Sequence, residues 1–225
     1  MNKIEGIKGL IFDLDGTIAD TISAIGDGIN EAMDHYGYPR KTYEDVRRAI
    51  GNGARLLIRR CMPADQTADE TLCEQVFAYY HEAYARTYLN TRECYKGIPE
   101  TIAALKQGGY RLAVLSNKQD EYTKGLIEQL LPRDTFEVVM GQTELPTKPS
   151  PVVPSLIAGQ LGLAPSECAM IGDSDVDIQT AKNAGMAAIG CSWGYRGRAA
   201  LEQAGADVVV DEAQELLQIL VQKSN

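Results

Sequence analysis

The sequence predicts an α/β fold, in which a Rossmann-like parallel sheet is covered by helices on both faces and an all-helical cap domain is inserted into the core. Short apolar runs of strand length alternate with segments of helix length, which is the pattern of a parallel sheet built from strand-helix-strand units. Polar or glycine-containing residues follow each run, as expected where a buried strand stops. One connection is much longer than the others, and this length indicates an insertion.

The expected core strands are apolar runs of four or five residues. The first is the run 9–12, which stops at Asp13 and Gly16, and the others cover residues 111–115, 168–171, 187–191 and 207–210. Helices are expected between and after them, at 99–107, 120–131, 151–161, 175–184 and 212–221. In such sheets ligands bind beyond the carboxyl ends of the strands. We therefore expect a functional site in the loops that follow these strands.

The spacing of polar residues locates the inserted domain. A strand-helix-strand unit takes about 30 residues, but 101 positions separate Asp15 from Ser116. We therefore expect a helical cap at residues 18–90 and a core at residues 1–17 and 91–225. Within the cap, apolar residues recur every three or four positions from Ile18 to Tyr36, and residues 69–88 form a second long helix.

Composition and charge exclude several classes of protein. Hydrophobic residues make up 44% and charged residues 24% of the chain, which is ordinary globular usage. The net charge of −9 argues against broad binding to DNA or anionic membranes. Five dispersed cysteines without a C-x-x-C pair, no signal peptide and no stretch near the roughly 18 apolar residues of a membrane span favour a cytoplasmic protein. A monomer and a homodimer both stay open.

Four loops carry the residues suited to chemistry. Asp13 and Asp15 follow the first strand two positions apart, which places their side chains on one side at a spacing of roughly 6 to 7 Å. The other loops carry Ser116 with Asn117, Lys148, and the run from Asp173 to Asp177. A lone D-x-D-G is as readily a surface turn. Together, however, the four loops supply carboxylates, a hydroxyl, an amide and an ammonium, the groups that hold a phosphoryl group beside a divalent cation.

In these residues the chain resembles the haloacid dehalogenase superfamily of phosphotransferases. The four motifs occur in order over nearly the whole chain: residues 12–17 (FDLDGT), Ser116-Asn117, Lys148-Pro149, and the run from Gly172-Asp173 to Asp177. A closer likeness is to bacterial phosphoglycolate phosphatases, which share the cap position, residues 50–53 (IGNG), residues 148–151 (KPSP) and Gly172-Asp173-Ser174 followed by Asp177. Related pyrophosphatases, sugar phosphatases and mutases share the core motifs, so the substrate stays open among these classes.

The resemblance implies a Mg²⁺-dependent phosphatase that acts on a small phosphomonoester through an aspartyl phosphate, with 2-phosphoglycolate as the first substrate to test. Asp13 would be the nucleophile and, with Asp173, a side-chain ligand of the metal. Asp15 would offer its backbone carbonyl to the metal and its carboxyl group as general acid and then general base. The summed charge of a substrate dianion, ionised Asp13 and ionised Asp173 is about −4, and Mg²⁺ and Lys148 reduce this sum to about −1.

The remaining site residues are expected to bind substrate or to orient the catalytic groups. Ser116 and Lys148 would hold the phosphate oxygens, and Asp177 would orient Lys148 or a metal-bound water. Further substrate-binding residues are expected in the core (Gly16, Thr17 and Asn117) and in the cap (Gly51, Asn52 and Gly53).

The cap glycines would let backbone N–H groups approach a small anion such as a carboxylate, with Arg47, Arg48 or Arg55 nearby. The alternative is a turn between helices with solvated arginines. Trp193 and Tyr195 follow a strand end and would line the pocket rim or pack in the core.

Some residues and functions receive less weight. Lys118 is expected to face solvent and to take no part in catalysis. Within the superfamily, a phosphomutase or an inorganic pyrophosphatase is an alternative function. A receiver module that accepts phosphate on an aspartate without catalysis is a further alternative, but the inserted cap and Asp15-Gly16-Thr17 argue against it.

Overall fold

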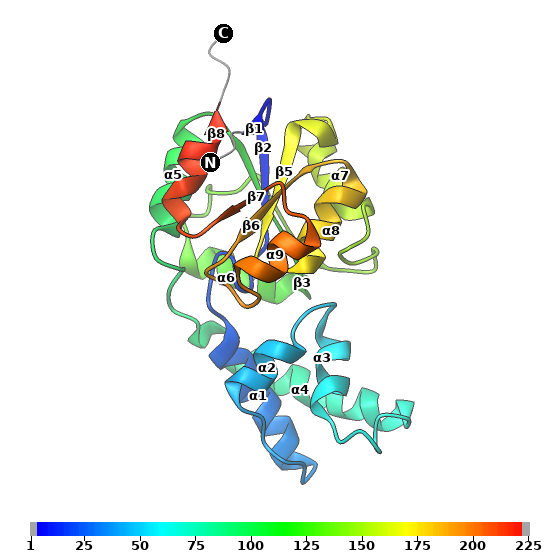
Figure 1. The fold of residues 1–225 in the computed structure, drawn as a ribbon. Helices are drawn as coiled ribbons and strands as arrows, with labels where there is room; N and C mark the ends of the chain where they lie inside the picture. Colours follow the sequence, from blue (N-terminus) through cyan, green and yellow to red (C-terminus); the bar gives the residue numbers. More distant parts are fainter. Residues whose placement is uncertain (1–3, 222–225) are drawn as a thin grey trace. The chain divides into compact units, whose positions relative to one another are not determined.

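The computed structural model of the chain describes residues 4–221, and Figure 1 shows their helices and strands. They form two compact units. The core unit combines the residues up to Asp20 with those from Glu93 onward, and the inserted unit is Thr21–Arg92. The boundaries expected after residues 17 and 90 precede the observed ones by three and two residues.

The core contains a six-stranded parallel sheet with the order β4-β3-β2-β5-β6-β7 (Figure 1). Its strands are β2 (Gly9–Phe12), β3 (Arg111–Gln119), β4 (Val138–Gln142), β5 (Cys168–Gly172), β6 (Ala187–Cys191) and β7 (Val208–Val210). A separate parallel pair joins β1 (Ile4–Glu5) to β8 (Leu220–Val221). β2 lies at the centre, hydrogen-bonded to β3 and β5. The predicted fold class is confirmed.

Helices cover both faces of the sheet. On one face, α7 (Val152–Gln160), α8 (Asp175–Ala184) and α9 (Arg198–Ala204) pack over buried side chains of alternate strand positions, such as Ile11 and Met170. The helices α5 (Ile98–Gln107) and α6 (Asp120–Leu130) lie on the other face, where α10 (Leu216–Ile219) packs against α5. Because both faces are covered, every residue of β2 is buried.

Several core elements differ from the prediction. β4 was not expected, because its five residues include a glycine and a glutamine and are mostly half-buried at the sheet edge. α9 has seven residues between Gly197 and Gly205, too few for a clear helical period. The helix expected at 212–221 is instead a 3₁₀ turn (Ala213–Glu215), the four-residue α10, and β8.

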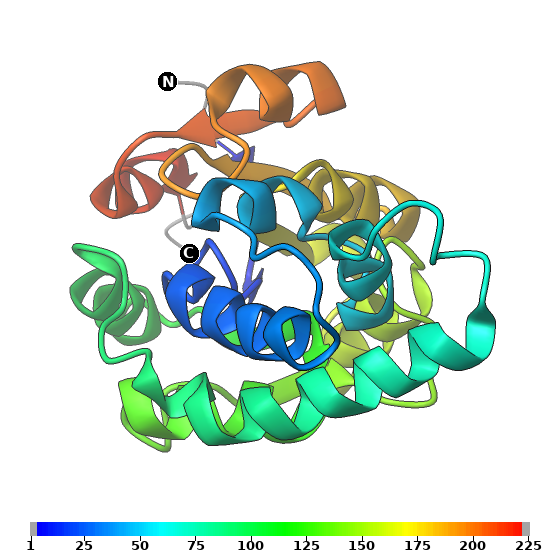
Figure 2. The same cartoon turned by 90° about the horizontal axis from the view of Figure 1, so that it is seen from below.

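The inserted unit is helical throughout, with α1 (Ile22–His35), α2 (Tyr43–Ala49), α3 (Ala54–Cys61) and α4 (Glu70–Thr87), followed by a 3₁₀ turn, Tyr88–Asn90. α1 and α4 pack along each other (Figure 2). The packing is close at Gly28, where a Cβ atom would lie 3.4 Å from the Tyr84 backbone. The apolar stripe of α1, including Ile25, Ile29 and Met33, is buried, as the periodicity predicts.

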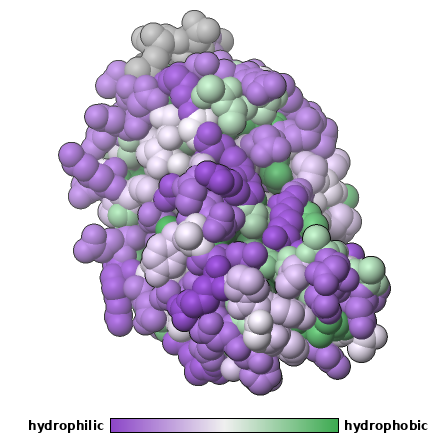
Figure 3. Space-filling view, turned by 60° about the horizontal axis from the view of Figure 1, so that its bottom comes forward, coloured by the Kyte–Doolittle hydropathy of each residue, from purple (hydrophilic) through white to green (hydrophobic). Residues whose placement is uncertain are grey.

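The surface is mainly polar, in keeping with the charge of the chain. Figure 3 shows hydrophilic side chains over most of the viewed face, with hydrophobic ones in small separate areas. Within residues 4–221, no helix combines the length and the apolar character needed to cross a membrane.

Candidate active site

The carboxyl ends of three neighbouring strands bring the predicted polar residues to one place. Asp13 directly follows β2, Ser116 lies in β3, and Asp173 directly follows β5. Asp177 lies in the first turn of α8, and Lys148 lies in the loop between β4 and α7. All five side chains are buried. Burial of ionisable groups is costly unless they are paired or bind an ion, so this cluster is a candidate functional site.

Lys148 lies between two carboxylates. Its Nζ atom is 2.8 Å from Asp13 Oδ1 and 2.7 Å from Asp177 Oδ1. Burial alone would lower the pKa of Lys148, but the charges of Asp13 and Asp177 outweigh burial and hold this pKa above its ordinary value. Lys148 is therefore a permanent positive charge beside the proposed nucleophile.

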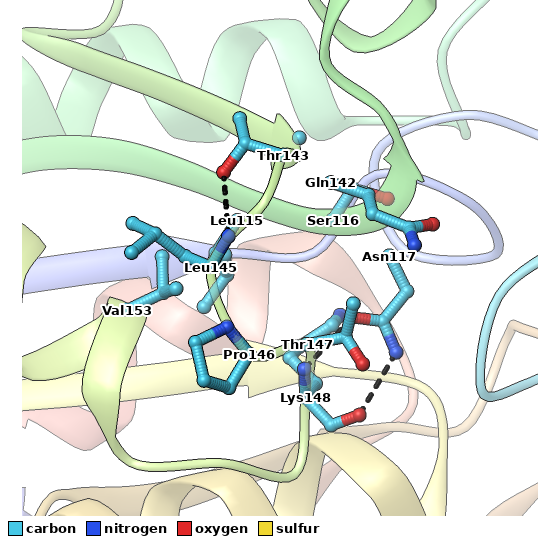
Figure 4. Close-up of a pocket in the computed structure, with 11 residues that line it drawn as sticks. Leu115, Ser116, Asn117, Gln142, Thr143, Leu145, Pro146, Thr147, Lys148 and Val153 are labelled. Carbon is cyan, nitrogen blue, oxygen red and sulfur yellow. Dashed lines mark hydrogen bonds between the residues drawn. The ribbon is translucent and has the colours of Figure 1, made fainter.

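Asn117 fixes the loop that carries Lys148. Its Nδ2 atom donates a hydrogen bond to the Lys148 carbonyl oxygen at 3.0 Å, and the Lys148 N–H donates to Asn117 Oδ1 at 2.9 Å. Figure 4 shows the Asn117 side chain pointing toward the Lys148 backbone, in a small pocket also lined by Leu115 and Ser116. Asn117 thus connects the end of β3 to the loop of the ammonium group.

The carboxylates of Asp13, Asp173 and Asp177 form a cluster with the geometry of a cation site. One oxygen from each lies within 4.8 Å of the others. Burial raises the pKa of Asp13 to about 7, with a further contribution from Asp177 and opposed by Lys148. Burial, then the charges of Asp177 and Asp13, also raise the pKa of Asp173. These shifts indicate that one ammonium does not fully offset the buried negative charge.

The donor set fits Mg²⁺, which prefers carboxylate, carbonyl and water oxygens. Asp177 is already engaged, because Oδ1 pairs with Lys148 and Oδ2 accepts hydrogen bonds from the Ser174 N–H at 3.1 Å and the Ser174 hydroxyl at 2.6 Å. Asp13 Oδ1 is buried and accepts no aligned hydrogen bond, although the Lys148 ammonium is near. Asp13 therefore has an oxygen available for a cation and Asp177 does not, and the role of Asp173 as the second side-chain ligand stays a prediction.

The start of α8 explains the G-D-S-D-V-D motif. Ser174 is the N-cap, and Ser174 and Asp177 form a reciprocal capping box. A Cβ atom on Gly172 would lie 2.2 Å from Asp177 Cγ, so glycine is needed there for the close approach of the helix. Asp175, in the same turn, is exposed.

The loop after β2 contacts the cluster through Gly16 and Thr17. Gly16 has a φ of +86°, and a Cβ atom there would lie 2.4 Å from Asp173 Oδ2. The Thr17 hydroxyl donates a hydrogen bond to Asp173 Oδ1 at 3.3 Å. The structure therefore places both residues against the proposed metal ligand.

The loop after β6 encloses the other side of Asp173. The Tyr195 N–H donates to Asp173 Oδ2 at 2.7 Å, and the Trp193 indole donates to the Thr17 carbonyl oxygen at 3.1 Å. A Cβ atom on Gly194 would lie 2.3 Å from both Asp173 Cβ and the Gly16 carbonyl oxygen. From the sequence, Trp193 and Tyr195 were expected only at the pocket rim or in the core. The contacts with Asp173 are made by a backbone N–H and by a glycine without a side chain, and residue type does not predict such contacts.

The expectation that Lys118 faces solvent is wrong. Its side chain is 6% exposed, and Nζ lies 3.1 Å from Asp15 Oδ1, whose side chain is 15% exposed. The prediction ended the strand at residue 115, but β3 continues to Gln119 with a register irregularity after Leu115. This continuation carries Lys118 into the site, and its position directly after Ser116-Asn117 was the available signal.

Gly51, Asn52 and Gly53 lie between α2 and α3 in the inserted unit. All three have positive φ angles, of 121°, 58° and 88°, which explains why the helices break there. The neighbouring arginines form exposed ion pairs within the inserted unit: Arg47 and Arg48 with Glu44, and Arg55 with Glu74. A role of this segment in binding an anion stays a prediction.

Comparisons with known proteins agree with this geometry. Residues 10–191 match the model of the haloacid dehalogenase-like hydrolase family. A phosphoglycolate phosphatase of Vibrio parahaemolyticus is 32% identical over 221 residues, covering 96% of this chain and 97% of that protein. One of Chromobacterium violaceum is 31% identical, covering 97% and 98%.

Solved structures show the same similarity. A predicted phosphoglycolate phosphatase from Haemophilus somnus 129pt superposes with a TM-score of 0.84 at 30% identity, covering 95% of this chain and 98% of that one. CbbY from Rhodobacter sphaeroides, solved in complex with phosphate, gives a TM-score of 0.75 at 25% identity, covering 93% and 96%.

Proposed function

The chain belongs to the haloacid dehalogenase-like hydrolase family, and we propose that it is a Mg²⁺-dependent phosphatase that hydrolyses a small phosphomonoester, with 2-phosphoglycolate as its first expected substrate. Membership in this family confirms the resemblance predicted from the four motifs. The observation that carries the proposal is the buried cluster of Asp13, Asp173 and Asp177, in which Asp13 and Asp177 pair with Lys148.

Asp13 is the nucleophile of the proposed reaction. Its carboxylate oxygen attacks phosphorus in line, the bond from phosphorus to the ester oxygen breaks, and an aspartyl phosphate forms. Mg²⁺, held by the side chains of Asp13 and Asp173 and the carbonyl of Asp15, would supply charge compensation for the phosphate oxygens. The Lys148 ammonium compensates further charge, and the Ser116 hydroxyl donates to a phosphate oxygen.

Asp15 moves the protons. Its carboxyl group gives a proton to the departing alkoxide in the first step and takes one from the attacking water in the second, when phosphate leaves Asp13. Such general acid-base catalysis is worth about 10²- to 10⁴-fold in rate. Asp177 is a positioning residue in this account, because it contacts Lys148 and the start of α8.

The names of the relatives support the substrate. Proteins that match this chain over more than nine-tenths of its length, at 30–33% identity, are named phosphoglycolate phosphatases. 2-Phosphoglycolate is a small ester with a dianionic phosphate group and a carboxylate. An enzyme that hydrolyses it would need one positive group near the phosphate and another near the carboxylate.

A panel of phosphate esters with Mg²⁺ tests the proposal. We expect phosphate release from 2-phosphoglycolate at a higher kcat/KM than from inorganic pyrophosphate or sugar phosphates, and loss of release in the Asp13→Asn variant. Asp175→Asn is the matched control, because it removes an exposed carboxylate at the first residue of α8. Isomerised ester without free phosphate would assign a mutase instead, and absence of any turnover would refute the proposed activity.

A further inference from the structure

Two lysines enter the core site, and the reaction as described uses one of them. Lys148 contacts Asp13 and Asp177, where the phosphoryl group is transferred. Lys118 contacts a different carboxylate, Asp15. On the basis of the proposed function, we propose that Lys118 is the residue that selects phosphate esters with a carboxylate next to the ester oxygen.

The burial of Lys118 is the first observation. An ammonium group is strongly hydrated in water, and its removal from water costs several kcal/mol unless other groups bind it. The Lys118 side chain is 6% exposed, against 53% for Lys124, six residues along the chain on α6. A buried lysine beside a proposed catalytic group is a candidate for a functional role, whereas an exposed one such as Lys124 is not.

The second observation is the position of Lys118 relative to the leaving group. Its Nζ atom is 3.1 Å from Asp15 Oδ1. In the proposed reaction Asp15 gives its proton to the ester oxygen, so this carboxyl group lies within hydrogen-bond distance of that oxygen. The carboxyl carbon of 2-phosphoglycolate is two covalent bonds of about 1.5 Å from the same oxygen. These distances bring the substrate carboxylate within reach of the Lys118 ammonium.

The donor capacity of the ammonium permits this role. A lysine ammonium has three N–H donors, so a single ammonium can bond to more than one carboxylate. Lys148 is already divided between Asp13, Asp177 and the phosphoryl oxygens. Lys118 also lies in β3, where the Lys118 N–H donates to Ser116 Oγ at 3.2 Å, so the backbone that positions it is that of the phosphate-binding loop.

The substrate side of the test uses the unmodified enzyme. The kcat/KM for 2-phosphoglycolate is compared with that for its amide and for ethyl phosphate, which have similar size and no carboxylate. We expect a preference of about 10- to 100-fold for the carboxylate, the range of a hydrogen bond between charged groups. An equal kcat/KM for the three esters overturns the proposal for Lys118 while leaving the phosphatase activity intact.

The protein side uses Lys118→Met and Lys118→Arg, with Lys124→Met as the matched control. Lys118→Met is expected to remove most of the preference, mainly through a higher KM for 2-phosphoglycolate, whereas Lys118→Arg and Lys124→Met keep it. An equal loss on charged and neutral esters would show that Lys118 serves only to hold Asp15, and overturns the selectivity role. If Lys118→Met does not fold, Lys118→Gln replaces it. Loss of the carboxylate preference in Lys118→Gln supports the selectivity role, and retention of the preference overturns it. Failure of the unmodified enzyme on every ester refutes the activity itself.

Discussion

Substitution of Gly194 tests how Asp173, the proposed metal ligand, is held. A methyl group at this position would lie 2.3 Å from Asp173 Cβ, 2.6 Å from Asp173 Cγ and 2.3 Å from the Gly16 carbonyl oxygen. These atoms belong to the backbone or lie next to it, so they cannot turn away as the end of a long side chain does. In Gly194→Ala, the loop after β6 must therefore move away from Asp173.

The hydrogen bonds of the loop indicate how much Mg²⁺ affinity Gly194→Ala should lose. Displacement lengthens the bond from the Tyr195 N–H to Asp173 Oδ2, now 2.7 Å, and the bond from the Trp193 indole to the Thr17 carbonyl oxygen, now 3.1 Å. A hydrogen bond to a charged group is worth about 1.5–3 kcal/mol. Loss of a group that orients a metal ligand costs about 10- to 100-fold in metal affinity or activity. We expect a loss of Mg²⁺ affinity in this range.

The affinity is measured by calorimetric titration of Mg²⁺ and, independently of turnover, by electron paramagnetic resonance of bound Mn²⁺. Gly159→Ala is the matched control, because a Cβ atom at Gly159, in α7, meets no atom within 4 Å. Its metal affinity should equal that of the unmodified protein. If Gly194→Ala folds and binds both metals as tightly as the control, the loop does not hold Asp173 in the way described.

The remaining predictions concern the nucleophile, its ammonium partner and pH. Asp13→Asn should abolish phosphate release and, in EDTA at pH 8, raise Tm, because it removes a buried charge. Asn117→Ala should lower kcat and destabilise the fold by about 2 kcal/mol, the worth of two hydrogen bonds to the Lys148 backbone. Burial raises the pKa of Asp13 in the folded state from 3.8 to about 7. The protonated Asp13 carboxyl group therefore contributes stability that is complete below pH 3.8 and is lost as pH rises through 7. Without metal, Tm should fall over this pH range, and Mg²⁺ should raise Tm again at pH 8.

Three measurements check these expectations. Thermal melts in EDTA and in Mg²⁺ follow the effect of Asp13 and of pH, and a Tm in EDTA that does not decline between pH 4 and 8 would contradict the burial of an uncompensated carboxylate. Urea unfolding with steady-state kinetics follows Asn117→Ala. A variant with unchanged kcat and stability would mean that the two hydrogen bonds do not position Lys148.

Much of the site could be predicted from the sequence because its residues follow strands with a strong apolar signal. The runs before Asp13 and Asp173 are buried on both faces, and such runs are visible without any structure. Parallel strands bring their carboxyl ends to one edge, so residues far apart in the chain could be placed together. The cap helices were predicted for a related reason, since α1 has a continuous apolar stripe.

The parts that were missed depend on geometry that residue type does not encode. Lys118 enters the site because β3 continues past an irregularity, and the apolar run that marks the strand ends before it, at Leu115. Gly194 and Tyr195 contact Asp173 through a missing side chain and a backbone N–H. The edge strand β4 has half-buried residues and a glycine, so its apolar signal is weak.

The formation of a covalent phosphate on Asp13 is the central chemical claim, and peptide mass spectrometry tests it most directly. The enzyme is quenched with acid during turnover of 2-phosphoglycolate with Mg²⁺, reduced with borohydride and digested. We predict that the peptide containing Asp13 gains one phosphoryl group before reduction and carries homoserine at position 13 after it. Phosphate release with no modification of Asp13, or with the phosphoryl group on another residue, would contradict it.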